Sequence, residues 1–394
     1  MSFESSHRGE PDDRADAGRA VGGDKRVEPL ELFFDLVFVF AITQVTARLA
    51  DDATWEGLLR GLLILAAIWW AWGAYAWLTN EVDTARNIVR LAMFAAMAGM
   101  LIVALAIPGA MEDDAYVFAG AYLAVRLVHI TLFAAGTEHG DVRVAAKTLA
   151  PTALLAPAIL LASAATNGAA QLILWALALG LDYIGGGLRG IRGWRLSPAH
   201  FAERHGLIII IALGESIIAI GVGAEGTRLE AATIAAACLG IVVVAGLWST
   251  YFDGSTERIE HHFHTLSGPE RNIAARDAYS FLHLPMVAGI VLFALGVKKT
   301  LEHVEDSLSV VSSFALCGGV ALYLLSQIAY RWRCQDPPGA QRLVAALICS
   351  ALVPVAMRMP ALAALAALAA VVSVLHLYEV RQSARKARVW APSP

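Results

Sequence analysis

Residues 28–46, EPLELFFDLVFVFAITQVT, decide the fold: they form an apolar run that carries two carboxylates, Glu31 and Asp35. Residues four apart share one face of a helix, and Thr43 and Gln44 follow about two to three turns later, near the same side. An acid inside an apolar helix is costly in lipid and persists only where it faces protein, water or an ion. The stretch therefore predicts a membrane protein with a polar interior, without naming what that interior binds.

The composition of the whole chain supports this prediction. Of its 394 residues, 58% are hydrophobic and only 16% are charged, whereas about one quarter of the residues of a soluble protein are charged. The small net charge of −4 indicates no nucleic-acid partner. Four cysteines without paired or metal-type spacing predict neither a disulfide framework nor a zinc site.

The apolar segments predict an all-α polytopic membrane protein with about twelve transmembrane helices. One span needs about 20 mainly apolar residues. Segments of this kind lie at 30–49, 55–78, 88–107, 115–136, 147–165, 169–187, 206–223, 229–252, 276–298, 308–330, 341–358 and 360–379.

The basic residues indicate the orientation of these segments, because Lys and Arg concentrate in cytoplasmic loops. If the N-terminus is cytoplasmic, 23 of the 30 Lys and Arg residues lie on the inner side. Six lie on the outer side, and Arg126 lies within a segment. We therefore expect both termini in the cytoplasm.

The second half of the chain repeats features of the first. Residues 31–44, ELFFDLVFVFAITQ, and 203–216, ERHGLIIIIALGES, both begin with Glu and end with a polar pair. The next segments share Trp-x-x-Tyr at 72–75 and 248–251, and the third segments share Ala-Gly at 98–99 and 288–289. Chance agreement among apolar helices is the alternative to two parallel six-helix repeats. The predicted units are a disordered cytoplasmic tail (1–26), a first repeat (27–195), a second repeat (196–380) and a basic cytoplasmic tail (381–394).

The buried acids allow two interpretations each. Glu31 and Asp35 could line an ion or proton path; alternatively, Glu31 caps its helix and Asp35 pairs with a buried arginine. Glu215 lies deepest in apolar sequence, between Gly214 and Ser216, and is the best candidate for a titrating or cation-coordinating group. The alternative for Glu215 is a structural ion pair with Arg126.

The other polar residues are expected to be structural. Arg126 needs an acidic partner such as Asp35, Glu215 or Asp182, so a structural ion pair is favoured over the alternative of an anion site. His129 is expected to be a hydrogen-bonded core histidine. Glu203, Arg204 and His205 are expected to cap the start of the seventh helix, with His200 just before it; a gate or proton relay is the alternative. The candidates for a transport path are Asp35, Glu215, Glu31, Thr43, Gln44 and Ser216. The candidates for buried pairs are Arg126, His129, Asp182, Glu203 and His205.

No catalytic, cofactor or metal site is predicted. The sequence lacks G-x-x-x-x-G-K-[ST], H-E-x-x-H and G-x-S-x-G, so neither an ATP motor nor a standard hydrolase is indicated. Residues 257–264, ERIEHHFH, place Glu257, His261 and His264 at near-helical spacing. That spacing could serve a metal, but a solvated loop is favoured. We expect a protein that is not an enzyme and whose partner is membrane lipid, with homo-oligomerisation left open.

Three stretches resemble the signature blocks of the bacterial low temperature requirement protein A (LtrA) family. They are residues 28–46, residues 78–87 (LTNEVDTARN) and residues 200–221 (HFAERHGLIIIIALGESIIAIG). The resemblance spans about 27–380 and implies an integral inner-membrane protein linked by name to growth in the cold, with no established activity. It carries over to Glu31, Phe34, Asp35, Thr43, Gln44, Glu203, His205, Gly214, Glu215 and Ser216.

A fainter similarity involves the first helix of the lysosomal potassium-channel family. Phe33-Phe34-Asp35, followed by Val37 and Thr43, is similar to its Phe-Ser-Asp signature, with Phe34 in place of the Ser. The resemblance implies a constriction formed by Val37, Phe38, Phe40 and Ala41 in one half and Ile209 to Ala212 in the other.

Three functions remain open at this point. The first is a transporter that moves a small ion or solute through a polar path between the two repeats. The second is an ion channel whose pore is lined by the first helix of each repeat. The third is a non-transporting accessory or sensor protein in which the buried charges only hold helices together.

Overall fold

The structure is a bundle of long helices. The computed structural model describes residues 26–136, 140–189, 194, 196–253, 256–337 and 339–390, so most of the predicted 1–26 tail lies outside the described residues. Within these ranges the chain forms helices and no strand. The bounds are α1 (Pro29–Asp51), α2 (Trp55–Glu81), α3 (Asn87–Leu105), α4 (Ala115–Gly136), α5 (Gly140–Ser163), α6 (Gly168–Arg189), α7 (Pro198–Ala224), α8 (Ala231–Phe252), α9 (Thr256–Thr265), α10 (Gly268–Ala275), η1 (Arg276–Phe281), α11 (His283–Glu302), α12 (Val310–Ser313), η2 (Phe314–Gly318), α13 (Gly319–Arg333), α14 (Ala340–Ala356) and α15 (Ala361–Trp390).

Ten helices in the described part of the chain are long and apolar enough to cross a membrane. Two of them are composite: residues 268–302 and 310–333 each run through a π-helical turn, η1 or η2. Two shorter apolar helices, Lys147–Ser163 and Ala340–Ala356, occupy the places of the predicted fifth and eleventh segments. The multi-pass, all-α class is therefore confirmed, while a total of twelve spans stays a prediction.

The centre of the bundle is formed by the two composite helices. In each, 78% of the most apolar window is buried, against 33% to 50% for most outer helices. α11 and α13 approach closely because glycine faces glycine: a Cβ built on Gly289 would lie 2.6 Å from the carbonyl oxygen of Gly319. Small residues at such crossings bring helix backbones into van der Waals contact.

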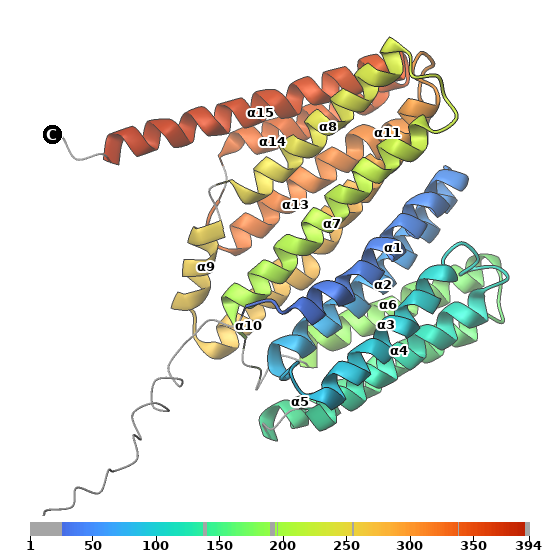
Figure 1. Ribbon diagram of the computed structural model, residues 1–394, viewed down its shortest axis with the longest axis vertical. Coiled ribbons are helices and arrows are strands. Elements are labelled where there is room, and N and C mark those ends of the chain that lie inside the picture. The colour runs from blue at the N-terminus through green and yellow to red at the C-terminus, as the bar shows by residue number, and fades with distance from the viewer. Residues whose placement is uncertain are drawn as a thin grey trace, which may run out of the picture.

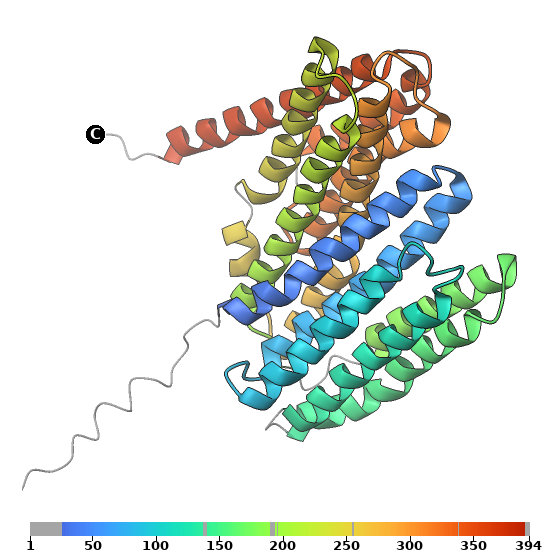
Figure 2. The same cartoon turned by 45° about the vertical axis from the view of Figure 1, so that its right-hand side comes forward.

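The two halves of the chain meet along α1 and α7. Helices α2 to α6 lie to one side of α1, and α8, α9 and α13 to α15 lie on the far side of α7 (Figures 1 and 2). α1 packs on α7 and α11, and α2 also contacts both. α1 and α7 run in the same direction, so their first turns lie close together, and residues far apart in sequence share one interface.

Two sequence expectations about this region are wrong. The seventh helix begins at Pro198, eight residues before the predicted segment 206–223, because proline after Ser197 starts a helix well. His200 therefore lies within the first turn of α7 and Arg204 a turn further on. Residues 257–264 belong to helix α9 rather than to a loop.

Candidate functional site

The first turn of α1 positions Glu31 towards α7. Glu28 and Glu31 form a capping box, in which the Glu28 amide donates to Glu31 Oε2 at 3.1 Å. The same carboxylate lies 2.8 Å from His200 Nε2 and 3.5 Å from Arg204 Nη1. Glu31 thus caps its own helix, as one interpretation held, and also joins it to α7.

Asp35 lies one turn further along α1 and shares the same arginine. Arg204 Nη2 donates to Asp35 Oδ1 at 2.7 Å, and the indole of Trp72 on α2 donates to the same oxygen at 2.9 Å. Arg204 and the two carboxylates are at most 1% exposed. We call Glu31, Asp35, Trp72, His200 and Arg204 the paired cluster, because each buried carboxylate in it has a basic partner.

Glu215 on α7 is buried like the other two acids, but no described basic side chain lies close to it. Thr43 of α1 donates a hydrogen bond to Glu215 Oε2 at 2.5 Å, and the glutamate is 2% exposed. Among the described residues, no Lys, Arg or His nitrogen lies within 4.0 Å of its carboxylate; the recorded buried ion pairs involve the other acids. Lys298 of α11 acts on it only from a longer distance. Thr43 and Glu215 form what we call the Glu215 site.

Buried apolar residues separate these two polar sites. Phe38, Ala41 and Ile42 of α1 are at most 4% exposed. On α7, Ile208, Ile209 and Ala212 are at most 1% exposed. Asp35 and Thr43 are eight residues apart, about 12 Å along a helix, so this apolar layer is about two turns thick. Of the residues expected to form a channel constriction, Phe38, Ala41, Ile209 and Ala212 are buried, Val37, Phe40 and Ile211 are half-buried, and Ile210 is exposed.

Arg126 pairs with Asp182 rather than with Asp35 or Glu215. Arg126 Nη2 lies 2.8 Å from Asp182 Oδ1, and both side chains are buried. His129, one turn along α4, places Nε2 3.1 Å from the carbonyl oxygen of Ala74. The prediction of a structural ion pair and of a hydrogen-bonded core histidine agrees with this geometry.

The remaining candidates are not part of either polar site. Gln44 is half-buried and makes no hydrogen bond within the described chain, and Ser216 Oγ is buried without a partner there. Glu203 is exposed and accepts from the Val27 amide at 3.2 Å. His205 is buried among aromatic rings, with Nδ1 2.8 Å from the Phe201 carbonyl oxygen.

Comparison with known proteins identifies the family of this chain. The family model described as bacterial low temperature requirement A protein (LtrA) matches residues 26–377. The chain belongs to the LtrA family. The chain is also similar to an uncharacterized protein of Rhizobium meliloti (strain 1021), with 29% identity over 308 residues, which cover 75% of this chain and 74% of the relative. No solved structure matches, so the lysosomal-channel resemblance has no support beyond its first-helix residues.

LtrA membership and the apolar helices together make the chain a multi-pass integral membrane protein. The two longest LtrA-like stretches, residues 28–46 and 200–221, supply α1 and α7. Apart from Trp72, every member of the paired cluster and of the Glu215 site lies in one of these two stretches. These two stretches therefore form the junction between the two halves of the chain.

Proposed function

We propose that this LtrA-family protein moves a proton or a small cation across the bacterial inner membrane, and that Glu215 binds it. The observation that carries the proposal is the contrast among the buried acids. Glu31, Asp35 and Asp182 each lie within 3 Å of a basic nitrogen, whereas the close partners of Glu215 are threonine hydroxyls of α1: Thr43 donates a hydrogen bond to it, and Thr46 lies beside it.

The contrast between paired and unpaired acids matters because a buried carboxylate is costly when it is ionised and has no partner. An ionised group in an apolar site costs several kcal/mol unless it is paired, and a membrane-buried acid typically marks an ion or proton pathway. Arg204 and Arg126 meet this requirement for the other acids. For Glu215 the requirement is met by a bound proton or cation, which competes with the hydrogen bond that the Thr43 hydroxyl donates.

Two parallel six-helix repeats are part of the proposal, and the packing order supports them. The contacts α1–α2, α1–α3, α3–α4, α4–α5 and α5–α6 have counterparts in α7–α8, α7–α11, α11–α13, α13–α14 and α14–α15. Gly99 of α3 and Gly289 of α11, from the two Ala-Gly pairs, each face the following long helix closely. Thr43 and Glu215 occupy corresponding places in the two quoted stretches, 31–44 and 203–216. Their hydrogen bond therefore lies at the interface of the repeats, where transporters of this type bind substrate.

The orientation with both termini in the cytoplasm also belongs to this proposal. The start of α1 and the end of α15 lie on the same, left-hand side of the bundle (Figure 1), in agreement with the distribution of basic residues. The paired cluster then faces the cytoplasmic side. The apolar layer next to it closes the way to Glu215, so cargo reaches the carboxylate from that side only after α1 and α7 move apart.

The test is ion flux into liposomes that hold the purified protein. Proton, sodium and potassium gradients are imposed in turn on wild-type vesicles and on protein-free vesicles. Saturable collapse of one gradient at transporter rates supports the proposal and identifies the cargo. Flux at channel rates favours a pore lined by the same helices. If folded protein collapses none of the three gradients, the proposal fails and the accessory or sensor role takes its place.

A further inference from the structure

Two threonine hydroxyls of α1 border the buried carboxylate of Glu215. Thr43 Oγ1 lies 2.5 Å from Glu215 Oε2, and Thr46 lies beside the same carboxylate. Each hydroxyl also lies 3.1 Å from a carbonyl oxygen one turn back in α1, Thr43 from that of Val39 and Thr46 from that of Ile42. Thr43 therefore has two acceptors within hydrogen-bond distance but only one hydrogen to donate.

The single hydrogen of Thr43 links its hydrogen bonding to the protonation of Glu215. An ionised carboxylate can only accept, so Thr43 donates to it. A protonated Glu215 donates its own O–H to Thr43 Oγ1, and Thr43 turns its hydrogen to the Val39 carbonyl oxygen. The bond to the ionised form is charge-assisted and is the stronger of the two. Turning one hydroxyl group thus satisfies both forms of the acid with the heavy atoms in the same places.

A dehydrated metal cation needs several oxygen ligands at once. Channels and transporters supply them with backbone carbonyls, often from unwound helices. Here α1 runs unbroken from Pro29 to Asp51 and α7 from Pro198 to Ala224, so their carbonyl oxygens accept the hydrogen bonds of the helices. The separation of 2.5 Å between the Glu215 and Thr43 oxygens has room for a shared hydrogen but not for a metal ion.

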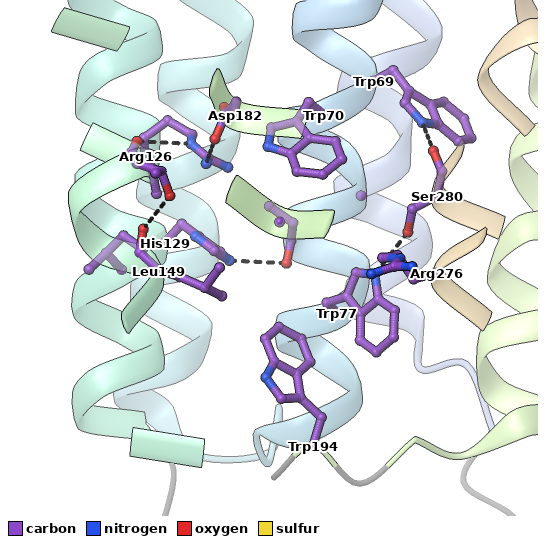
Figure 3. A pocket seen from close by; sticks show the side chains of 16 residues that line it. Trp69, Trp70, Trp77, Arg126, His129, Leu149, Asp182, Trp194, Arg276 and Ser280 are labelled. Atoms are coloured by element: carbon purple, nitrogen blue, oxygen red, sulfur yellow. Dashed lines mark hydrogen bonds and ion pairs between the residues drawn. The ribbon is translucent and has the colours of Figure 1, made fainter. Parts of the chain in front are cut away.

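The cavity that the structure shows lies away from Glu215. It opens between Trp70 and Trp77 of α2 and Arg126 and His129 of α4 (Figure 3), and α5, α6 and the π-turn η1 complete it. Its volume is about 80 Å³, and its lining includes no residue of α1 or α7. Glu215 is 2% exposed, so its surroundings are packed, and a proton is the cargo that needs no cavity.

Few charged groups face Glu215 from the helices that contact α7. α8 carries no charged residue, and Lys298 of α11 acts on Glu215 from beyond ion-pair distance. The charges of the paired cluster lie on the other side of the apolar layer. Other charged residues on these helices form pairs of their own: Arg48 with Asp52 and Glu112, Arg60 with Glu56, Lys299 with Glu302, and Arg258 with Asp336. Loading of the site therefore changes the charge of one carboxylate.

We propose that the cargo of Glu215 is a single proton and that Thr43 is the hydroxyl that adapts to its arrival and departure; this inference rests on the proposed transport function. A proton from water on one side of the membrane adds to Glu215 Oε2, and the new O–H donates to Thr43. Release of that proton to water on the other side restores the hydrogen bond from Thr43 to the carboxylate. The cycle uses no metal ion.

The first test is infrared spectroscopy of the full-length protein in liposomes, because a protonated carboxyl group has a carbonyl stretch that a carboxylate lacks. The difference between wild type and Glu215→Gln should contain one such band. It should titrate with the slope of one proton whether or not sodium or potassium is present. Thr43→Val should move the band to higher wavenumber, since the acid loses its acceptor, and Thr43→Ser should leave the band unchanged.

The second test is flux in the same vesicles. Proton flux reported by a dye should saturate with sodium absent, while uptake of radioactive sodium and rubidium should match that of protein-free vesicles. Sodium or rubidium uptake that is lost in Glu215→Gln overturns the proton as cargo and leaves the proposed transport standing. A Glu215 band that is missing, or that shifts its titration with sodium or potassium, also overturns it. An unchanged band in Thr43→Val overturns the role of the hydroxyl. If none of the three ions crosses, the transport proposal fails and this inference with it.

Discussion

Apart from Trp72 of α2, the paired cluster and the Glu215 site lie on the same two helices, α1 and α7, but their buried carboxylates have different kinds of partner. In the paired cluster, Arg204 bridges Glu31 and Asp35, with distances of 3.5 Å and 2.7 Å. In the Glu215 site, the nearest polar partner is a threonine hydroxyl. One region carries its own countercharge and locks α1 to α7. In the other, no described basic side chain lies within 4.0 Å of the carboxylate, which suits it to an exchangeable ion.

This difference predicts that the two regions respond oppositely to substitution. Changes in the paired cluster should destabilise the protein, because they leave a buried charge without its partner. Changes at Glu215 should spare stability and remove flux. The predictions below run from the largest expected effect on free energy to the smallest.

Arg204→Gln should lower the free energy of unfolding by about 3–5 kcal/mol, because it leaves two buried carboxylates without their shared guanidinium. Denaturant-induced unfolding in mixed micelles measures the loss. The double variant Arg204→Gln with Asp35→Asn should be less destabilised than the two single losses combined, since the residues share a bond. An Arg204→Gln protein as stable as wild type would show that the cluster does not hold the helices together.

Trp72→Phe should cost about 1.5–3 kcal/mol, the usual value of a hydrogen bond to a charged group, because Asp35 loses its indole donor. The matched control is Trp248→Phe, the corresponding tryptophan of the second half. Trp248 is 45% exposed, so its loss should change stability by no more than about 0.5 kcal/mol. Equal effects at the two positions would contradict the role given to the Trp72 N–H group.

Thr43→Val should lower the ion concentration for half-maximal flux about tenfold and reduce the maximal rate. The cargo-free carboxylate loses the hydrogen bond from Thr43, so it holds the cargo more tightly and releases it more slowly. Thr43→Ser keeps the hydroxyl and should behave as wild type does. Concentration-dependent flux in liposomes gives both quantities, and a raised half-saturation concentration would show that Thr43 is a ligand of the cargo instead.

Glu215→Gln should change the free energy of unfolding by less than about 1 kcal/mol, because glutamine keeps an oxygen that can accept from Thr43 and no ion pair is lost. The same unfolding experiment measures it beside Arg204→Gln. A loss as large as that of Arg204→Gln would mean that Glu215 has a charged structural partner, and the contrast between the two regions would disappear.

The membrane class and most helix positions could be predicted from the sequence, because long apolar runs carry that information without tertiary contacts. The burial of Glu215 could be predicted for the same reason: it lies in the middle of the apolar run 206–223, and its side chain is 2% exposed. The sequence limits the partner of Arg126 to three acids but does not identify Asp182 among them, because the partner depends on how α4 and α6 pack.

A helix cap at Glu31 and a buried arginine beside Asp35 could be predicted as one of two interpretations, but the partners on α7, His200 and Arg204, were not identified. His200 and Arg204 were placed at the helix boundary because segment 206–223 was defined by hydropathy alone. Pro198 starts the helix earlier, and the four-residue spacing of His200 and Arg204 then matches that of Glu31 and Asp35. On parallel helices, an acidic face and a basic face with the same spacing are complementary in charge. Comparing residues 28–46 with residues 200–221 could therefore have revealed this pairing. The cavity could not be predicted, because α2, α4, α5, α6 and η1 all contribute to it.

The most direct test of the central claim is ion flux through folded Glu215→Gln protein in liposomes, measured beside Glu225→Gln. Both variants carry the same substitution near the same helix, but Glu225 is exposed at the end of α7. We predict that Glu215→Gln abolishes the saturable flux of wild type while Glu225→Gln retains it. Wild-type flux through folded Glu215→Gln protein would contradict the assignment of this carboxylate as the ion-binding group.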